Sequence, residues 1–119
     1  MVAAINDRDR SAVEDLSSPG VQLRLPPGRV FYGRDGVHAF FDELEKLLPD
    51  LTVAARKVWR GMGFVIIEWE AAAHSLAGTE RDSMGVVVLE LDAGGRIERV
   101  QLYLDTAEWD AVHGEALSQ

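Results

Sequence analysis

The sequence predicts an α+β domain in which helices come first and an antiparallel sheet follows. Helical periodicity is clearest in residues 37–48, where apolar side chains recur at the i, i+3, i+4 and i+7 spacing of one helix face. After Asp50 the chain changes to extended runs rich in β-branched and aromatic residues, separated by short glycine turns. Helices followed by strands are typical of α+β folds rather than of alternating parallel α/β folds. A chain of 119 residues suffices for one domain with a single core.

The first half is predicted to contain two helices, two short strands and two turns. The predicted elements are a helix over 9–16 with Asp9 as N-cap, a turn at 17–20, strands at 21–25 and 30–32, a turn at 33–36, and the helix over 37–48. Pro49 lacks a backbone donor and is expected to end the long helix.

The second half is predicted to form a four-stranded antiparallel meander. Its strands are expected at 51–60, 64–73, 81–91 and 96–104, with a closing helix over 106–112 capped by Thr106. The last two strands flank the turn Asp92-Ala93-Gly94-Gly95 and form the clearest hairpin. This hairpin places Asp105 at the end of the final strand.

Composition excludes several classes of function. The formal net charge of −8 makes nucleic acids and anionic membranes poor partners. No apolar run approaches the roughly 20 residues of a bilayer span, and the N-terminus shows no signal-peptide pattern. The absence of cysteine excludes disulfides and thiolate chemistry and is compatible with a reducing cytoplasm. Three scattered histidines lack metal-ligand spacing, and 33–36 is no phosphate loop, so neither a metal nor a cofactor is expected.

Three segments, taken in order, resemble a known family. The first is Tyr32 to Phe41, where the pattern G-x-x-G-V-x-x-F-F leads into a helix. The second is Val65 to Gly78, which contains E-W and H-x-x-x-G. The third is Gly85 to Asp105, which contains G-G-R-I and Y-x-D. This set is similar to the SnoaL-like polyketide cyclases of the nuclear transport factor 2-like and ketosteroid isomerase-like superfamily. The resemblance implies a cone: a strongly curved antiparallel sheet with helices over its concave face and an apolar pocket between them. It also implies a homodimer formed through the outer sheet face.

The resemblance implies a single domain over residues 1–119 with a shortened N-terminal helix. Family members carry a long lid helix before an N-x-x-D step, which is matched here by Asn6 to Asp9. Only residues 1–5 precede this step, so we expect a more open pocket.

Two residues are predicted to be catalytic on the strength of this resemblance. Asp105 matches the strand-end aspartate of Y-x-D, which in the cyclase and isomerase branches abstracts a proton next to a carbonyl. An apolar pocket raises the pKa of a carboxyl group toward the range useful for a base. His74 matches the histidine of the family strand and is predicted either to act as the acid or to hydrogen-bond a substrate oxygen. The alternatives are that Asp105 caps the helix starting at Thr106 and that His74 bonds a backbone carbonyl.

Ligand-binding residues are predicted from side-chain alternation and aromatic content. Gln101, Tyr103 and Asp105 share one face of the last strand, and Leu102 and Leu104 share the other, so either face could line the pocket. The predicted ligand contacts are Tyr103, Gln101, Trp69, Trp59, Phe40, Phe64 and Met84. The alternative for the aromatic residues is packing in the core or at a dimer interface.

The expected function is binding of a small apolar or polycyclic molecule, with cofactor-free isomerase or cyclase chemistry by proton abstraction. One alternative is a non-catalytic binding or dimerisation module of the same fold. Another is an epoxide-hydrolase-like enzyme, although the Asp-Arg-Asp spacing of that branch is not found around Arg99 and Asp105.

Overall fold

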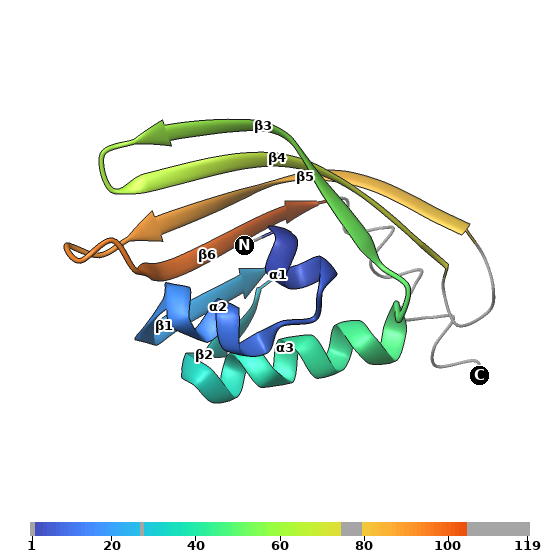
Figure 1. The fold of residues 1–119 in the computed structure, drawn as a ribbon, viewed down its shortest axis with the longest axis horizontal. Helices are drawn as coiled ribbons and strands as arrows, with labels where there is room; N and C mark the ends of the chain where they lie inside the picture. The colour runs from blue at the N-terminus through green and yellow to red at the C-terminus, as the bar shows by residue number, and fades with distance from the viewer. Residues whose placement is uncertain (1, 27, 75–79, 105–119) are drawn as a thin grey trace.

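The computed structural model describes residues 2–26, 28–74 and 80–104, which form a six-stranded sheet with three helices on one side (Figure 1). The helices are α1 Val2–Asn6, α2 Arg10–Leu16 and α3 Gly33–Leu47. The strands are β1 Ser17–Leu25, β2 Arg29–Tyr32, β3 Thr52–Gly61, β4 Phe64–His74, β5 Glu80–Leu91 and β6 Ile97–Leu104. They lie in the order β2-β1-β6-β5-β4-β3.

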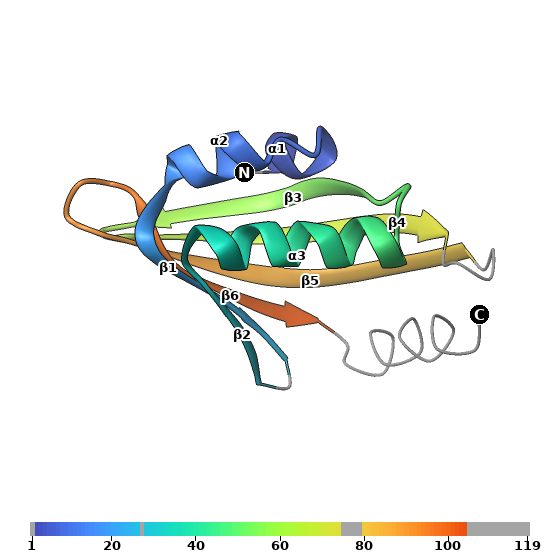
Figure 2. The same cartoon turned by 90° about the horizontal axis from the view of Figure 1, so that it is seen from below.

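The long strands curve over the helices, so the described helices cover the concave face of the sheet and none of them lies on its convex face (Figure 1). Seen from below, α3 runs along the middle of the concave face, and α1 and α2 lie beside it toward β3 (Figure 2). This arrangement confirms the predicted α+β fold with a curved sheet and helices over its concave face. Within the described ranges, each helix is too short or too polar to cross a membrane.

The predicted meander is confirmed as the antiparallel series β3-β4-β5-β6. The two early strands join the same sheet, because β1 pairs with β6 in parallel and β2 pairs with the other edge of β1. No local pattern predicts this parallel pairing, which joins segments more than 70 residues apart. It makes β6 a central strand.

The turn predicted at residues 17–20 is wrong, because these residues begin β1. Ser17 is buried, its hydroxyl donates to the carbonyl of Val13 at 2.6 Å, and its backbone aligns with Ile97 of β6. The register then shifts between Ser17 and Gln22. Pro19 lies in this irregular stretch, where a missing backbone donor disturbs the ladder least.

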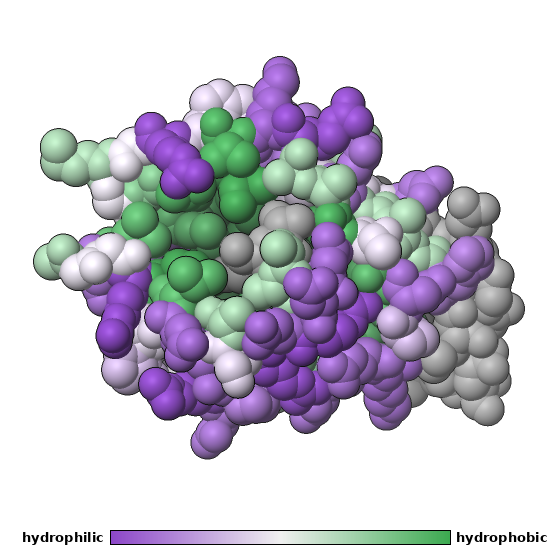
Figure 3. Space-filling view, viewed as in Figure 1, coloured by the Kyte–Doolittle hydropathy of each residue, from purple (hydrophilic) through white to green (hydrophobic). Residues whose placement is uncertain are grey.

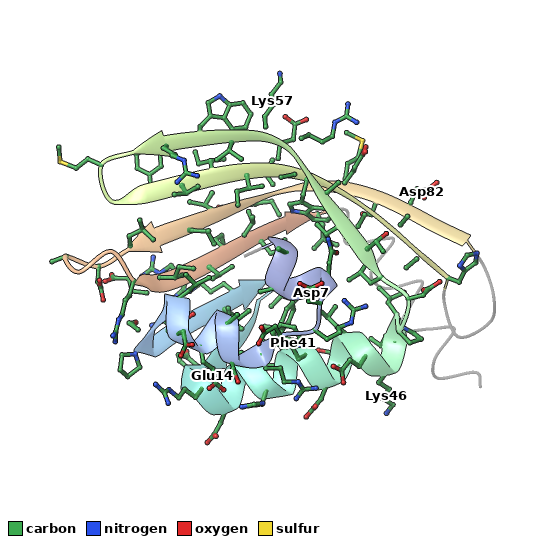
Figure 4. All side chains as sticks on the ribbon, viewed as in Figure 1. Asp7, Glu14, Phe41, Lys46, Lys57 and Asp82 are labelled. Atoms are coloured by element: carbon green, nitrogen blue, oxygen red, sulfur yellow. The ribbon has the colours of Figure 1, made fainter. Side chains whose placement is uncertain are left out.

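The long helix begins at Gly33, four residues before its predicted start, so the turn expected at 33–36 is its first turn. Glycine at position 36 allows this first turn to pack closely against Phe31. A Cβ at Gly36 would lie only 2.8 Å from the carbonyl carbon of Phe31. The buried face of α3 carries Val37, Phe41 and Leu44, as the periodicity predicts. Phe41 points toward the sheet and Lys46 away from it (Figure 4).

The main core lies between the concave face and the helices. Its buried residues are Ala4, Val13, Val21, Leu23, Leu25, Val37, Phe41, Ile67, Leu89 and Ile97. Asp9 caps α2 as predicted, accepting a hydrogen bond from the amide of Ala12 at 3.0 Å. The helix predicted at 106–112 lies outside the described residues.

Candidate functional site

A cavity of about 190 Å³ lies between the helices and the concave face of the sheet. Hydrophobic surface is visible between the sheet above and the helices below, framed by hydrophilic side chains (Figure 3). Every helix and every strand from β3 to β6 contributes to the lining, as does β1. The lining includes Ile5, Val13, Leu23, Val37, Phe40, Phe41, Leu44, Val53, Ile67, Trp69, Ala71, Ser83, Val87, Leu89, Val100, Leu102 and Leu104.

Alternation along β6 determines which of its side chains reach the cavity. Leu102 and Leu104 line it, together with Val100, whereas Gln101 and Tyr103 point to the opposite side. That side is the convex face, on which Lys57 of β3 extends away from the helices (Figure 4). The polar face of the last strand therefore lies outside the cavity.

The described lining is nearly free of polar side chains. Ser83 is a polar member, and Arg24 also borders the cavity but is aligned with Gln101, whose side chain points to the other face. Trp69 contributes its indole ring, whose Nε1 is buried. No aspartate, glutamate or histidine is found among the lining residues that the structure describes. This wall favours an apolar molecule and offers no described group for acid–base chemistry.

Hydrogen bonds hold the N-terminal helices over the cavity. The side chain of Asn6 donates to the carbonyl of Val53 at 2.8 Å and accepts from its amide at 2.7 Å. The guanidinium of Arg8 donates to the carbonyls of Ile5 at 2.7 Å and Leu51 at 3.0 Å. These bonds fasten the end of α1 to the start of β3, so this side of the cavity is covered.

An ion pair joins α2 to α3 on the same side. Arg10 lies 2.7 Å from Asp42 and 2.9 Å from Glu45. Its guanidinium also sits over the ring of Phe41, 5.6 Å from the ring centre. Cation–π contacts of this kind add modestly to the packing of the helices against each other.

His74 lies at the end of β4 and is held by Asp50. The backbone N–H and ring Nδ1 of His74 each lie 2.8 Å from a different oxygen of the Asp50 carboxylate. These two bonds, the backbone bond first, hold the pKa of the Asp50 carboxyl below its ordinary value. Because an ionised carboxylate only accepts, Nδ1 is the donor. Both side chains are exposed, and neither lines the cavity.

The predicted site residues are divided between the two faces of the sheet. Trp69 and Phe40 line the cavity. The other predicted ligand contacts, Trp59, Phe64, Met84, Gln101 and Tyr103, are not in its lining, and four of them, all but Gln101, are exposed. Asp105 lies outside the described residues, so its role stays a prediction, and no contact between it and His74 is described.

Sequence reasoning missed the small residues that make room in the cavity. Gly85 is aligned with Trp69, and a Cβ at Gly85 would overlap Cζ2 of the indole and the carbonyl oxygen of Tyr103. Ala71 and Ser83 are the next aligned pair on the same face. The pattern G-x-V at 85–87 could have indicated a close approach, since glycine inside a strand is unfavourable without such a reason.

Comparison with known proteins agrees with this architecture. The model of the SnoaL-like domain family matches residues 1–100. No curated protein matches the chain at a significant level.

Many solved structures share the fold. A nuclear transport factor 2-like protein of unknown function from Burkholderia pseudomallei is 19% identical with a TM-score of 0.86, covering 93% of this chain and 89% of that protein. TerC, co-crystallised with polyporic acid, is 20% identical with a TM-score of 0.84, covering 93% and 90%. A candidate SnoaL-like polyketide cyclase from Jannaschia sp. CCS1 is 16% identical with a TM-score of 0.81, covering 92% and 81%.

Proposed function

The chain belongs to the SnoaL-like domain family, and we propose that its cavity binds a small, largely apolar molecule. The observation that supports this is an apolar cavity of about 190 Å³ bordered by residues of the main core. Apolar cavities of about 150 Å³ stay dry and accept molecules of the size of benzene. A ligand of one or two rings would suit this volume. The complex of TerC with polyporic acid supports the use of this fold for small molecules.

Energetics also support an occupant for the cavity. An empty cavity costs about 24 cal/mol for each Å³, because the side chains around it lose dispersion contacts. A ligand that fills the space restores those contacts and removes its own apolar surface from water. Binding is therefore expected to raise the unfolding temperature.

Filling the cavity with a side chain provides the test. Ala71→Phe places a ring inside it, so we expect tetralin, a two-ring hydrocarbon, to bind at least about tenfold more weakly than to the wild type, as measured by calorimetric titration. The matched control is Ala72→Phe, one residue along β4 on the exposed face. Equal binding by both variants, or none by the wild type, would contradict the proposal.

A more specific function would be the abstraction of a proton from the bound molecule. This activity would depend on Asp105 and His74. The fixed Nδ1 of His74 supports a role in holding or moving a proton, whereas the described cavity lining favours binding alone. Deuterium uptake next to the carbonyl of a bound ketone in heavy water would separate the two. Catalysis requires uptake above the uncatalysed rate.

We also propose that the convex face pairs with a second copy of the chain. Trp59, Ile66 and Val88 lie side by side across three strands, and Val86 is aligned with Tyr103. Trp59 is 47% exposed, and Tyr103 is 55% exposed. Exposed apolar side chains that are contiguous on a sheet mark an association surface.

Sedimentation equilibrium tests this pairing. The wild type is expected at about twice 13.1 kDa. Trp59→Glu would bury a charge in the interface and is expected to give monomers. Met62→Glu, at a fully exposed turn position, is the control and should stay dimeric. A wild type that sediments as a monomer would overturn the pairing.

A further inference from the structure

A second hollow lies on the convex face of the sheet, where the β1–β2 hairpin meets β6. It is an open groove of about 410 Å³, and Arg24, Pro26, Val30, Gln101 and Tyr103 are among the residues that line it. Arg24 is aligned with Gln101 of β6 on one side and with Val30 of β2 on the other, so these three side chains share one face. The groove is therefore separate from the cavity under the helices.

Arg24 brings a partly buried positive charge to this groove. Its Nε donates to Oε1 of Gln22 at 3.3 Å, and no carboxylate of the described residues forms an ion pair with it. The donors on its two terminal nitrogens thus have no partner among the described residues. Taking a charge out of water without a counter-charge is unfavourable, and an anion in the groove would supply one.

The neighbouring arginines differ from Arg24 in this respect. Arg29 also lines the groove, but its guanidinium pairs with Glu43 of α3 on the helix side of the sheet. Arg99 lies on the convex face two residues before Gln101, and its Nε is 3.2 Å from a carboxylate oxygen of Glu90. Of these three cations, Arg24 alone has a charge that no described carboxylate balances.

Two uncharged donors accompany Arg24 in the groove. The amide nitrogen of Gln101 reaches the carbonyl of Leu102 at 3.5 Å, which is the outer limit of a hydrogen bond, so it has a donor to offer. The ring of Tyr103 is more than half exposed, and its hydroxyl makes no hydrogen bond with the described residues. Pro26 and Val30 add apolar wall beside them. The groove therefore combines one cation and two donors with apolar surface.

The charge and shape of Arg24 indicate which anion fits. A guanidinium carries a single positive charge, and its planar fork matches the two oxygens of a carboxylate. A phosphate dianion would keep an excess negative charge beside a chain whose net charge is already −8. The groove is also much larger than a carboxylate group, and Tyr103 offers an aromatic ring for the remainder of the ligand.

We propose that this groove binds an aromatic monocarboxylate, with the carboxylate on Arg24 and Gln101 and the aromatic body beside Tyr103. The site does not depend on the function proposed for the cavity. It lies toward β2, whereas Trp59 of the proposed pairing surface lies on β3 at the other edge of the sheet.

The test compares 2-naphthoate with its neutral amide, 2-naphthamide, by calorimetric titration. The wild type is expected to bind naphthoate at least about tenfold more tightly, the effect of one charge-assisted pair. Arg24→Met keeps the apolar stem and removes the charge, so it should lose this preference. Arg99→Met removes a charge that Glu90 already balances and is the matched control, which should keep the preference. Inorganic phosphate at the concentration of naphthoate should not displace it.

A second comparison separates this groove from the cavity. Ala71→Phe fills the cavity, so it should weaken the binding of tetralin and leave the affinity for naphthoate unchanged. An NMR readout on the wild type does not depend on the folding of any variant: naphthoate should shift the side-chain N–H signals of Arg24 and Gln101 and leave that of Arg99 in place.

Four outcomes would overturn the groove. They are equal affinity for naphthoate and naphthamide, equal losses in Arg24→Met and Arg99→Met, displacement by phosphate, and loss of naphthoate binding in Ala71→Phe. The last would place naphthoate in the cavity and so support the function proposed there. Failure of tetralin to bind while naphthoate binds through Arg24 would contradict that function and leave the groove intact.

Discussion

Replacing Phe41 by alanine is expected to lower the free energy of unfolding by about 3–5 kcal/mol. Phe41 is only 1% exposed, packs edge-on against Phe40 with ring centres 6.1 Å apart, and carries Arg10 over its face. It also borders the cavity, so its removal enlarges an existing space rather than leaving a gap that neighbours can close. Urea denaturation with linear extrapolation measures the change.

The matched control for this variant is Phe40→Ala, one residue along α3. Phe40 is only partly buried, so its truncation removes less apolar surface from the core and should cost less. If both variants lose the same stability, or if Phe40→Ala loses more, Phe41 is not the centre of the packing between α3 and the sheet.

Gly85→Ala is expected to destabilise the domain by about 1–3 kcal/mol although it adds a single methyl group. A Cβ at Gly85 would overlap the carbonyl oxygen of Tyr103, which is backbone, and Cζ2 of Trp69. A strand backbone cannot move aside as a flexible side chain does, so either β6 shifts or the indole leaves its place. Thermal unfolding followed by circular dichroism gives the loss of stability, and the near-ultraviolet signal reports the indole.

Gly20→Ala provides the comparison at another strand glycine. Nothing lies within 4 Å of a Cβ at Gly20, and its φ is not in the left-handed region. Its stability should therefore be unchanged or slightly raised, because alanine restricts the unfolded chain. A Gly85→Ala protein as stable as this one would mean that the close approach of β5 to Trp69 is not a constraint on the fold.

Much of the fold could be predicted from local signals. The i, i+3, i+4 spacing predicted the buried face of α3, and Asp9 as N-cap predicted the start of α2. The turn at Asp92-Ala93-Gly94-Gly95 predicted the β5–β6 hairpin. Each of these depends on residues a few positions apart. The turn prediction at 17–20 was wrong because Ser17, at the start of this stretch, is aligned with Ile97 of β6, 80 residues later. Such a distant pairing overrides local turn propensity.

The site was less predictable for a related reason. Alternation divided β6 into two faces but did not say which face is concave, and the polar face proved to be convex. Trp69 and Phe40 could be predicted as cavity residues from their size and position. The pairing of His74 with Asp50 could not, because it joins two loop-adjacent residues 24 positions apart without any motif.

The parallel pairing of β1 with β6 has a consequence for the order in which the molecule can be completed during synthesis. When residues up to 91 have left the ribosome, β3, β4 and β5 can already pair, but the β1–β2 hairpin has no partner on its other side. One edge of β1 and one edge of β5 are then unpaired, and both pair with the same eight-residue strand, β6. Open edges of this kind pair readily with other chains. A nascent chain is therefore most prone to aggregation in the interval before residues 97–104 emerge. Pairing of β6 then covers the open edges of both β1 and β5.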